Sequence, residues 1–179
     1  MTKKLIIGCL IFGAAAFAAY YLTVLATPYA VLAFVKTGAK SKLNQPVYSD
    51  IITDKDRHVV LPNPDFLYVA CGYNLWEGPL RITGKMPDNS YASVALYASN
   101  TKNYYILNDR QVPQKEFDVL LVKEKDRSKF QTSENEVVAS PTNLGVILMR
   151  ILINDTSNID YLSNIRDSFK VQLVEQQKN

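Results

Sequence analysis

His58 is the only histidine of this 179-residue chain, so it decides whether a conventional nucleophilic site can form. A serine or cysteine nucleophile needs a base that is neutral near pH 7, and histidine is the usual one. His58 stands between Arg57 and Val59, ahead of the first strongly strand-like segment. This setting is typical of a surface or lead-in residue. We therefore expect no catalytic residues, and we lean towards a protein that is not an enzyme.

Metal-ligating side chains are too few for the common zinc sets, which need three or four His, Cys or carboxylate ligands. Cys9 lies in an apolar N-terminal segment and Cys71 in a strand-like one, so the two cannot pair within one domain. Asp54, Asp56 and Asp65 could hold a hard cation, but they lack the spacing of a calcium loop. No glycine-rich phosphate loop is present. The sequence predicts no metal and no cofactor, and it favours Cys71 as a buried apolar filler.

The segment from Asn63 to Asp65 has two interpretations. It can be a turn in which Asn and Asp bond their own backbone before a strand begins. Alternatively, Asp65 is a buried carboxylate paired with Arg150, the only charge in residues 144–153. A charge in an apolar run must usually be paired or face water. Such a pair would lock two distant strands, and with Asn108 it could line a polar pocket.

Tyrosine is abundant, and six of the eleven tyrosines lie on strand-like segments. Core and cross-strand packing is one explanation. The other is an exposed aromatic face for a protein or glycan partner. Tyr91 and Tyr97 share strand parity, opposite to Val94 and Leu96. The candidate partner face consists of Trp76, Tyr91, Tyr97 and Tyr104.

These side chains must be positioned by a chain that begins with an apolar segment. Residues 5–35 carry no charge and are almost all apolar, which is long enough to cross a bilayer as a helix. A cleaved signal peptide is the alternative, but cleavage after Ala18 would leave a strongly apolar start, and cleavage after Ala26 would need an unusually long apolar region. We predict an anchor over residues 1–35 whose helix ends near Ala26, because Pro28 breaks helix continuity.

Flanking charges bear on orientation. Lys3 and Lys4 precede the apolar segment, and Lys36, Lys40 and Lys42 follow it, so the lysines alone leave the orientation ambiguous. A short basic start before an apolar run is usual for an uncleaved signal anchor, which exports its C-terminal side. We therefore expect the remaining chain to lie outside the cytoplasm.

The rest of the chain is long enough for one domain with a real core. Residues 36–50 are polar and predict a linker or lead-in, and the domain itself is expected over residues 51–179. Without Lys3 and Lys4, the chain contains 18 basic and 17 acidic side chains. This near balance argues against nucleic acid, which needs a concentrated basic face.

Period-two alternation dominates the domain and predicts short strands. An apolar run at 144–153 is rich in β-branched residues, which favours another strand. A short helix begins near Ser157 or Asn158, and its apolar residues recur at helical spacing up to Phe169. This pattern predicts a mainly β fold, an antiparallel sandwich or partly open barrel with one short C-terminal helix. The remaining expected strands are 66–75, 80–86, 91–98, 103–108, 116–123, 137–139 and 169–174.

Four short motifs occur in a fixed order along the domain. They are PNPDFLY at 62–68, NLWEGPL at 74–80, YASVALY at 91–97, and SPTNL at 140–144 with Arg150 after it. In this order they resemble the bacterial domain of unknown function 1254 family, over about residues 60–175. The chain departs from the family pattern at Phe66, where threonine is usual, and at Asn74, where aspartate is usual.

The resemblance implies a mostly β envelope protein of the small membrane-anchored type found in alphaproteobacteria. It also implies a partner protein that carries the companion domain of unknown function 1214, and it implies no established reaction. The residues that match the family motifs, and so are candidates for a structural or functional role, are Asn63, Asp65, Tyr68, Gly78, Pro79, Ser140, Pro141 and Arg150.

Together these observations predict a single-pass protein of the bacterial inner membrane with its C-terminal domain in the periplasm. We expect this domain to be non-catalytic and to bind a partner protein. The alternative is an envelope enzyme or a small-ligand-binding domain with a polar pocket near Asp65 and Arg150. A deep pocket with convergent polar groups would favour the alternative, and a flat aromatic or open strand-edge surface would favour partner binding.

Overall fold

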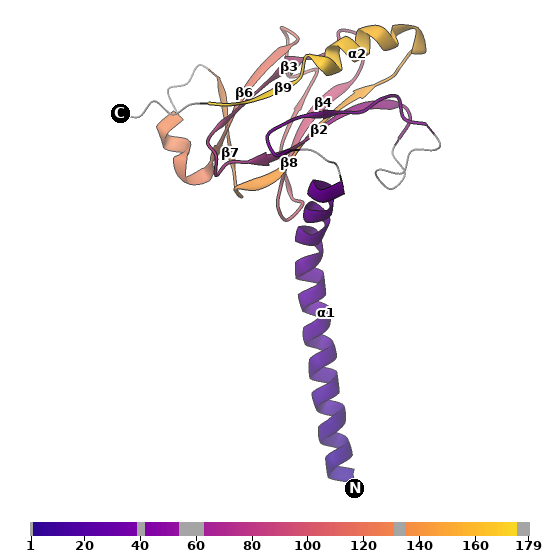
Figure 1. The fold of residues 1–179 in the computed structure, drawn as a ribbon, viewed down its shortest axis with the longest axis vertical. Coiled ribbons are helices and arrows are strands. Elements are labelled where there is room, and N and C mark those ends of the chain that lie inside the picture. Colours follow the sequence, from indigo (N-terminus) through magenta and orange to yellow (C-terminus); the bar gives the residue numbers. More distant parts are fainter. Residues whose placement is uncertain (1, 39–41, 54–62, 131–134, 175–179) are drawn as a thin grey trace.

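The computed structural model describes residues 2–38, 42–53, 63–130 and 135–174. A long N-terminal helix, α1, stands apart from two packed β-sheets, and a short helix, α2, lies on the far side of the sheets (Figure 1). The prediction of a mainly β domain with one short C-terminal helix is confirmed. The two sheets form an open sandwich.

Helix α1 runs from Thr2 to Gly38 without a break, so the predicted end near Ala26 is wrong. Pro28 lies inside the helix, where its missing N–H costs one backbone hydrogen bond. Next to it, the Thr27 hydroxyl donates to the Thr23 carbonyl at 2.7 Å. The carbonyl that Pro28 leaves without a donor is that of Val24, and strongly apolar helices tolerate such a proline where local adjustments satisfy the freed group.

The stretch Lys3–Ala30 of α1 is long and apolar enough to cross a membrane, and none of it is buried against the rest of the protein. At 1.5 Å per residue its 28 residues extend over ~42 Å, more than the ~30 Å of a bilayer's hydrocarbon core. The helix therefore has the dimensions of a membrane anchor.

Nine strands in the described residues form the two sheets. The five-stranded sheet has the order β1 (Val47–Tyr48), β2 (Phe66–Asn74), β8 (Leu144–Leu152), β4 (Ala92–Ala98) and β5 (Asn103–Asn108), and all its pairs are antiparallel. The four-stranded sheet has the order β7 (Glu136–Ser140), β6 (Glu116–Lys123), β3 (Leu80–Lys85) and β9 (Lys170–Leu173).

Strands β6 and β7 run parallel, which a purely antiparallel sandwich does not contain. Part of the charged segment between them forms a 3₁₀ helix, η1 (Glu124–Phe130). Parallel neighbours need a crossover connection instead of a tight hairpin. The segment that includes η1 supplies that length.

The period-two alternation located the strands well. The predicted strands 103–108 and 116–123 coincide with β5 and β6, and the apolar run at 144–153 is strand β8. In β2 and β8, half-buried and buried residues alternate strictly. Such alternation arises when one side of a strand packs on a core and the other faces outward.

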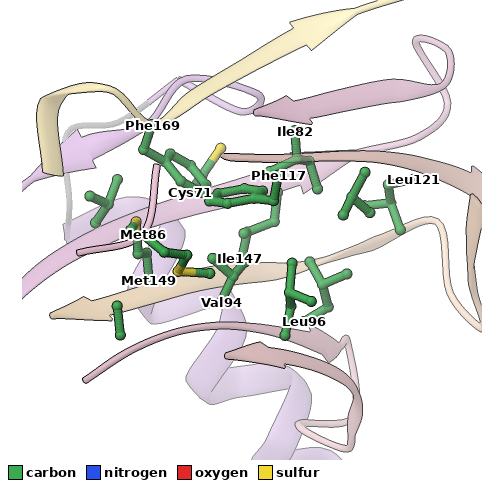
Figure 2. Packing of buried hydrophobic residues seen from close by; sticks show 14 of the residues in the cluster. Cys71, Ile82, Met86, Val94, Leu96, Phe117, Leu121, Ile147, Met149 and Phe169 are labelled. Atoms are coloured by element: carbon green, nitrogen blue, oxygen red, sulfur yellow. The ribbon is translucent and has the colours of Figure 1, made fainter. Parts of the chain in front are cut away.

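Apolar side chains from both sheets fill the space between them. Figure 2 shows Phe117 of β6 and Phe169, just before β9, packed together, and their ring centroids lie 6.3 Å apart. Met86, Met149 and Ile147 fill the neighbouring space and are almost completely buried. The core is therefore shared by the two sheets.

Helix α2 (Ile159–Asp167) follows a 3₁₀ turn, η2 (Thr156–Asn158), and packs Leu162 and Ile165 into the core cluster. The helix begins near Ser157 and Asn158 as expected, but neither side chain caps it. Asp155 instead accepts a hydrogen bond from the Ser157 N–H at 2.8 Å, and the Asn158 side chain makes no capping bond. The 3₁₀ turn moves the start of the helical segment towards the N-terminus, so the carboxylate of Asp155 reaches the first free N–H.

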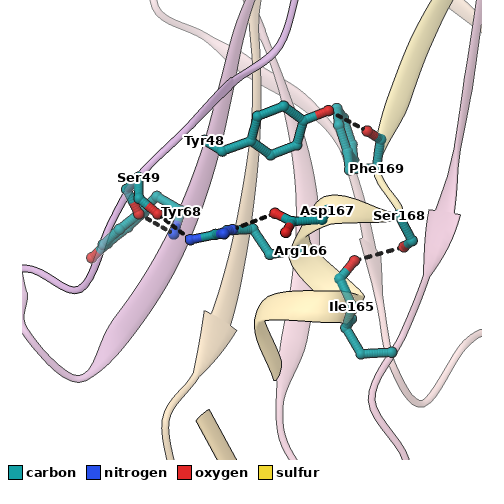
Figure 3. Close-up of polar contacts among 8 residues, drawn as sticks. All are labelled: Tyr48, Ser49, Tyr68, Ile165, Arg166, Asp167, Ser168 and Phe169. Carbon is teal, nitrogen blue, oxygen red and sulfur yellow. Dashed lines mark hydrogen bonds and ion pairs between the residues drawn. The ribbon is translucent and has the colours of Figure 1, made fainter. Parts of the chain in front are cut away.

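The segment that was expected to be a linker or lead-in is tied into the domain at strand β1. Figure 3 shows the Tyr48 hydroxyl donating to the Phe169 carbonyl, at 2.7 Å. The Ser49 hydroxyl accepts from the Tyr68 N–H at 2.9 Å, and the Arg166 guanidinium donates to the Ser49 carbonyl. These bonds join the segment that follows α1 to β2, α2 and the start of β9.

Candidate functional site

The five-stranded sheet has one face turned away from the core. Because side chains alternate along strands, the register of β1, β2, β8, β4 and β5 places their outward residues side by side. We call this surface the outer sheet face. It consists of Val47, Phe66, Tyr68, Ala70, Gly72, Asn74, Ser93, Ala95, Tyr97, Ile106, Asn108, Leu144, Val146, Leu148, Arg150 and Leu152.

Most side chains of the outer sheet face are apolar and remain partly exposed. Phe66, Leu148 and Leu152 are half-buried, although they lie on the inner strands β2 and β8. Ile106, on the edge strand β5, is 53 % exposed. Apolar surfaces of this kind mark interaction sites when they are contiguous.

A row of polar side chains crosses the middle of the outer sheet face. Tyr68 of β2 is the register partner of Arg150 in β8, Arg150 is the partner of Ser93 in β4, and Ser93 is the partner of Asn108 in β5. Neighbouring strands lie ~4.8 Å apart, so the row spans about 14 Å. We call these four residues the polar row. Arg150 is the only charged side chain of the outer sheet face.

The chain enters the domain along the outer sheet face. A Cβ placed on Gly72 would lie 3.1 Å from Leu43 Cδ2, so the Leu43 side chain covers the face at that point. The Asn44 N–H donates to the Gly72 carbonyl at 2.7 Å. In Figure 1, α1 lies on the side of β2 and β8, whereas β3, β9 and α2 are far from it. The outer sheet face therefore lies on the side of the apolar helix.

A second polar cluster is buried between the sheets, at the end where β2 meets β7. The Tyr104 hydroxyl donates to Tyr73 Oη at 3.1 Å, Tyr73 lies 2.8 Å from Ser140 Oγ, and Ser140 donates to the Thr142 carbonyl at 2.6 Å. Burial raises the pKa of Tyr104 well above its usual value. Gly145 makes room for this chain, because a Cβ there would lie 2.3 Å from Tyr73 Oη. The motif that contains Ser140 and Pro141 therefore joins the two sheets.

The motif that contains Gly78 and Pro79 builds the turn between β2 and β3. Asn74 Nδ2 donates to Glu77 Oε1 at 2.7 Å, and Asn44 Nδ2 donates to the other carboxylate oxygen of Glu77 at 3.0 Å. Gly78 has φ +147°, a backbone conformation that favours glycine. Pro79 is buried, and its carbonyl accepts from the N–H of the residue after β9 at 2.9 Å. This motif also has a structural role in the described residues.

The turn interpretation of Asn63 to Asp65 is confirmed. Asn63 Oδ1 accepts from the Asp65 N–H at 2.9 Å, and the Asp65 side chain is exposed. The alternative interpretation, an ion pair between Asp65 and Arg150, is wrong, since no ion pair of the described residues contains either one. Asp65 precedes β2 and its carbonyl bonds to the N–H of Ile153, whereas Arg150 lies opposite Tyr68. The register thus separates the two side chains along the strands.

The structure spreads the candidate partner residues over several places. Tyr97 lies on the outer sheet face, and Trp76, in the turn after β2, is 62 % exposed. Tyr91, 39 % exposed, precedes β4 at the opposite end of that strand from Tyr97. The Tyr104 hydroxyl points inward to the buried cluster. Only Tyr97 therefore belongs to the outer sheet face itself.

Other candidate sites give little chemistry. A shallow groove lies between β3, β6 and the end of α2, and a smaller one lies near Tyr161, and neither is lined by Asp65, Asn108 or Arg150. The described residues contain no group of three side chains suited to a metal. His58, Asp54 and Asp56 lie outside the described residues.

Cys71 is a buried filler, as the sequence favoured. It lies on the core side of β2 and is 1 % exposed. Burial raises the pKa of its thiol to about 12. The thiolate, which is the reactive form of cysteine, is therefore scarce near neutral pH.

Sequence reasoning missed two residues that matter here. Ser93 looked like an ordinary strand residue, and its place in the polar row follows only from the pairing of β4 with β8 and β5. Gly145 carried one usable signal, because an isolated glycine in a strand pattern often marks a close approach of another group. Asn108 and Arg150 were expected at one site, and the polar row does contain both.

The fold and the outer sheet face define a class of protein: a β-sandwich that follows a long apolar helix and keeps one sheet face partly apolar. Within this class, the chain belongs to the family described as "Protein of unknown function (DUF1254)", whose sequence model matches residues 43–173. The resemblance drawn from the four motifs is thereby confirmed. No curated protein matches the chain.

Two solved structures share the fold at low sequence identity. The VPA0106 protein from Vibrio parahaemolyticus is 13 % identical, with a TM-score of 0.65, and the match covers 87 % of this chain and 39 % of that one. An uncharacterized protein from Burkholderia cenocepacia is 14 % identical, with a TM-score of 0.51, and covers 87 % of this chain and 42 % of its own. This chain therefore matches about two fifths of each longer protein.

Proposed function

We propose that this protein is a non-catalytic, single-pass protein of the bacterial inner membrane whose periplasmic β domain binds a partner protein through the outer sheet face. The observation that carries the proposal is the partly exposed apolar surface of β2, β8 and β5. Phe66, Leu148 and Ile106 contribute apolar area that water solvates poorly. A partner that covers this area would gain the free energy of removing it from water.

The lengths of the solved relatives support a partner. Each longer protein has more than half of its chain outside the matched region. We propose that a separate protein supplies to this chain what the longer chains hold within themselves. The family resemblance implies that the separate partner protein carries the companion domain of unknown function 1214.

The proposed location follows from the anchor. Lys3 and Lys4 precede the apolar helix, an arrangement that is usual for a signal anchor whose C-terminal side is exported. The outer sheet face lies on the side of α1. A partner bound there would lie between the β domain and the membrane. Tyr97 would contact it directly, and Trp76 and Tyr91 would flank it.

Co-purification of the full-length protein from its own cells, in detergent, tests this function. Ile106→Asp places a charge on the exposed edge of the outer sheet face, and Gln172→Asp places the same charge on the opposite sheet, where Gln172 is exposed. We expect one envelope protein in stoichiometric amount with the wild type and with Gln172→Asp, and its loss with Ile106→Asp.

Mass spectrometry identifies the recovered protein. Recovery of this chain alone would contradict the proposal, and so would a partner that both variants retain equally. Circular dichroism of both variants shows whether the β domain is intact, so that loss of the partner is not confused with unfolding.

A further inference from the structure

Two polar atoms in the centre of the outer sheet face have no hydrogen-bond partner among the described residues. They are Arg150 Nε and Ser93 Oγ, and both atoms are buried. Arg150 and Ser93 are register partners on adjacent strands, so the two atoms belong to the same part of the polar row. The third buried atom of this kind, Tyr105 Oη, belongs to a residue paired with Leu96, which is on the core side.

These unpartnered atoms are unusual because buried polar groups are nearly always hydrogen-bonded. A buried donor without an acceptor costs free energy, and the cost is larger for a charged group. None of the ion pairs among the described residues contains Arg150. Arg150 is therefore a half-exposed cation whose buried Nε–H has no acceptor among the described residues.

We infer that Arg150 receives a carboxylate side chain of the partner protein, presented by an apolar segment that covers the outer sheet face. This inference rests on the proposed function and names the partner's chemistry. A guanidinium binds a planar carboxylate through two parallel N–H donors. The Ser93 hydroxyl is next to Arg150 in the polar row and can donate to the same group, whereas Asn108 lies one strand further away.

The charge of the face favours a carboxylate over a phosphate or an anionic membrane. One guanidinium balances the single charge of an Asp or Glu side chain. Phosphate sites usually combine several cations or a helix N-terminus, and anionic lipids bind clusters of lysine and arginine. The outer sheet face has one cation and no helix N-terminus within the part of the chain that the structure describes.

The apolar surroundings favour a protein segment over a free carboxylate ion. Leu148 and Leu152 precede and follow Arg150 on the same face of β8, and Phe66 lies opposite Leu152. An apolar segment that packs on these side chains would exclude water from the ion pair, which strengthens the attraction between its charges. Such a buried pair selects a partner strictly, because a partner without the acid leaves Arg150 buried and unpaired.

A titration of the full-length protein in uncharged detergent tests the inference without any partner. The probes are hexanoate, hexanamide of the same length but no charge, and inorganic phosphate. The readout is the ¹⁵N–¹H signal of the arginine Nε–H groups, in which the Arg150 signal is assigned by its absence from Arg150→Lys. We expect hexanoate to shift the Arg150 signal and to leave that of Arg81, on the other sheet, unchanged.

Two results would overturn the inference: no shift with hexanoate, or an equal shift with hexanamide. An equal or larger shift with phosphate would also overturn it, because it would indicate a phosphate or lipid headgroup as the natural ligand. This titration is independent of the proposed function. A failed co-purification refutes partner binding and leaves the titration to decide the chemistry of Arg150.

When a partner co-purifies, Arg150→Gln extends the test to the complex. The variant keeps a polar side chain and removes the charge, and Arg81→Gln is the matched control. We expect at least a tenfold loss of partner with Arg150→Gln, an intermediate loss with Arg150→Lys, and none with Arg81→Gln. Full retention by Arg150→Gln would refute the carboxylate inference while partner binding itself stands. Unfolding curves of the free variants confirm that they are folded.

Discussion

The outer faces of the two sheets rest on one core and differ in how they treat charge. On the four-stranded sheet, Lys85 lies directly opposite Glu116 and pairs with it at 3.1 Å. Arg81 pairs with Asp118, diagonally across the same two strands. The outer sheet face of the five-stranded sheet has a single charge, Arg150, and this charge has no ion-pair partner among the described residues.

This difference shows on which face the polar and charged groups are satisfied by each other and by water. Charges that pair across strands and remain hydrated cost little to expose, so the face of the four-stranded sheet is satisfied by its own residues and solvent. Leu120 and Val122 are exceptions on that face, and both are buried. The outer sheet face keeps apolar side chains partly exposed and two polar atoms unpartnered. The same core thus supports one self-sufficient surface and one that gains by being covered.

Glycines on opposite faces of the five-stranded sheet give the largest expected contrast. In Gly145→Ala, the new Cβ would lie 2.1 Å from the Tyr97 carbonyl oxygen and would displace Tyr73 as well. We expect a loss of about 3 kcal/mol or more in the free energy of unfolding, because backbone and a buried ring must both move. Guanidinium chloride unfolding of the full-length protein in detergent, followed by near-ultraviolet circular dichroism, measures it.

Gly72→Ala is the control on the outer sheet face. Its Cβ would meet only the end of the flexible Leu43 side chain, at 3.1 Å. We expect a small change, and a loss as large as that of Gly145→Ala would show that the outer sheet face is packed as tightly as the core.

Hydroxyl deletions compare a satisfied polar cluster with an unsatisfied one. Tyr73→Phe removes the oxygen that joins Tyr104 to Ser140, and we expect a loss of about 1–3 kcal/mol because buried groups lose their partners. Ser93→Ala removes a hydroxyl that has no partner in the described residues, so we expect stability to stay the same or to rise slightly. The same unfolding assay applies, and a larger loss for Ser93→Ala would refute the contrast.

The buried thiol of Cys71, in the core beneath both faces, makes the free energy of unfolding depend on pH. Burial raises the pKa of Cys71 from 9.0 to about 12, so the unfolded chain loses this proton at lower pH than the folded protein. Stability is therefore full below pH 9 and falls as the pH rises towards 12, by about 1.4 kcal/mol per pH unit. Burial raises the pKa values of Tyr104 and Tyr105 too, and these groups add to the loss above pH 10.

Unfolding midpoints from pH 8 to 11 check this prediction. Cys71→Ala, in a background where the exposed Cys9 is changed to Ser, should show a flatter fall between pH 9 and 11 than its parent. Parallel curves for the two proteins would mean that the Cys71 thiol titrates normally in the folded state.

The smallest expected effect concerns the charged face. Lys85→Gln removes one exposed ion pair and should lower the free energy of unfolding by about 0.5 kcal/mol or less, since water and salt screen such pairs. The difference from wild type should vanish in high salt. An effect above 1 kcal/mol would show that this face depends on its charges as the core depends on its packing.

Residue patterns within single segments predicted most of the fold. The composition of the outer sheet face depends instead on which strands pair with each other. Alternation is a property of single segments, so β5 and β6 could be placed to the residue, and the β-branched residues of β8 identified it as a strand. The continuation of α1 past Pro28 depends on apolar flanks that outweigh one lost hydrogen bond. The pairing of Arg150 with Ser93 depends on which strands become neighbours, and no single segment contains that information.

The expected Asp65–Arg150 pair illustrates the same limit. The two residues lie in or next to segments that do pair, β2 and β8. A register difference of three residues then separates the side chains by about 10 Å along the strand. The apolar run around Arg150 indicates that its charge must be paired or face water, and only the register shows that Asp65 does not pair with it.

The short interval between α1 and the domain would limit how the protein meets the proposed partner. The chain ends its helix at Gly38 and is bonded into the sheet at Asn44, through the N–H donated to Gly72. Six residues can extend at most about 20 Å, so Asn44, where the chain joins the outer sheet face, stays within that distance of the end of the helix. A partner in the same membrane then meets it by diffusion in two dimensions, at a high effective concentration. Modest affinity is enough for a stable complex there, and the same two surfaces would separate readily in dilute solution.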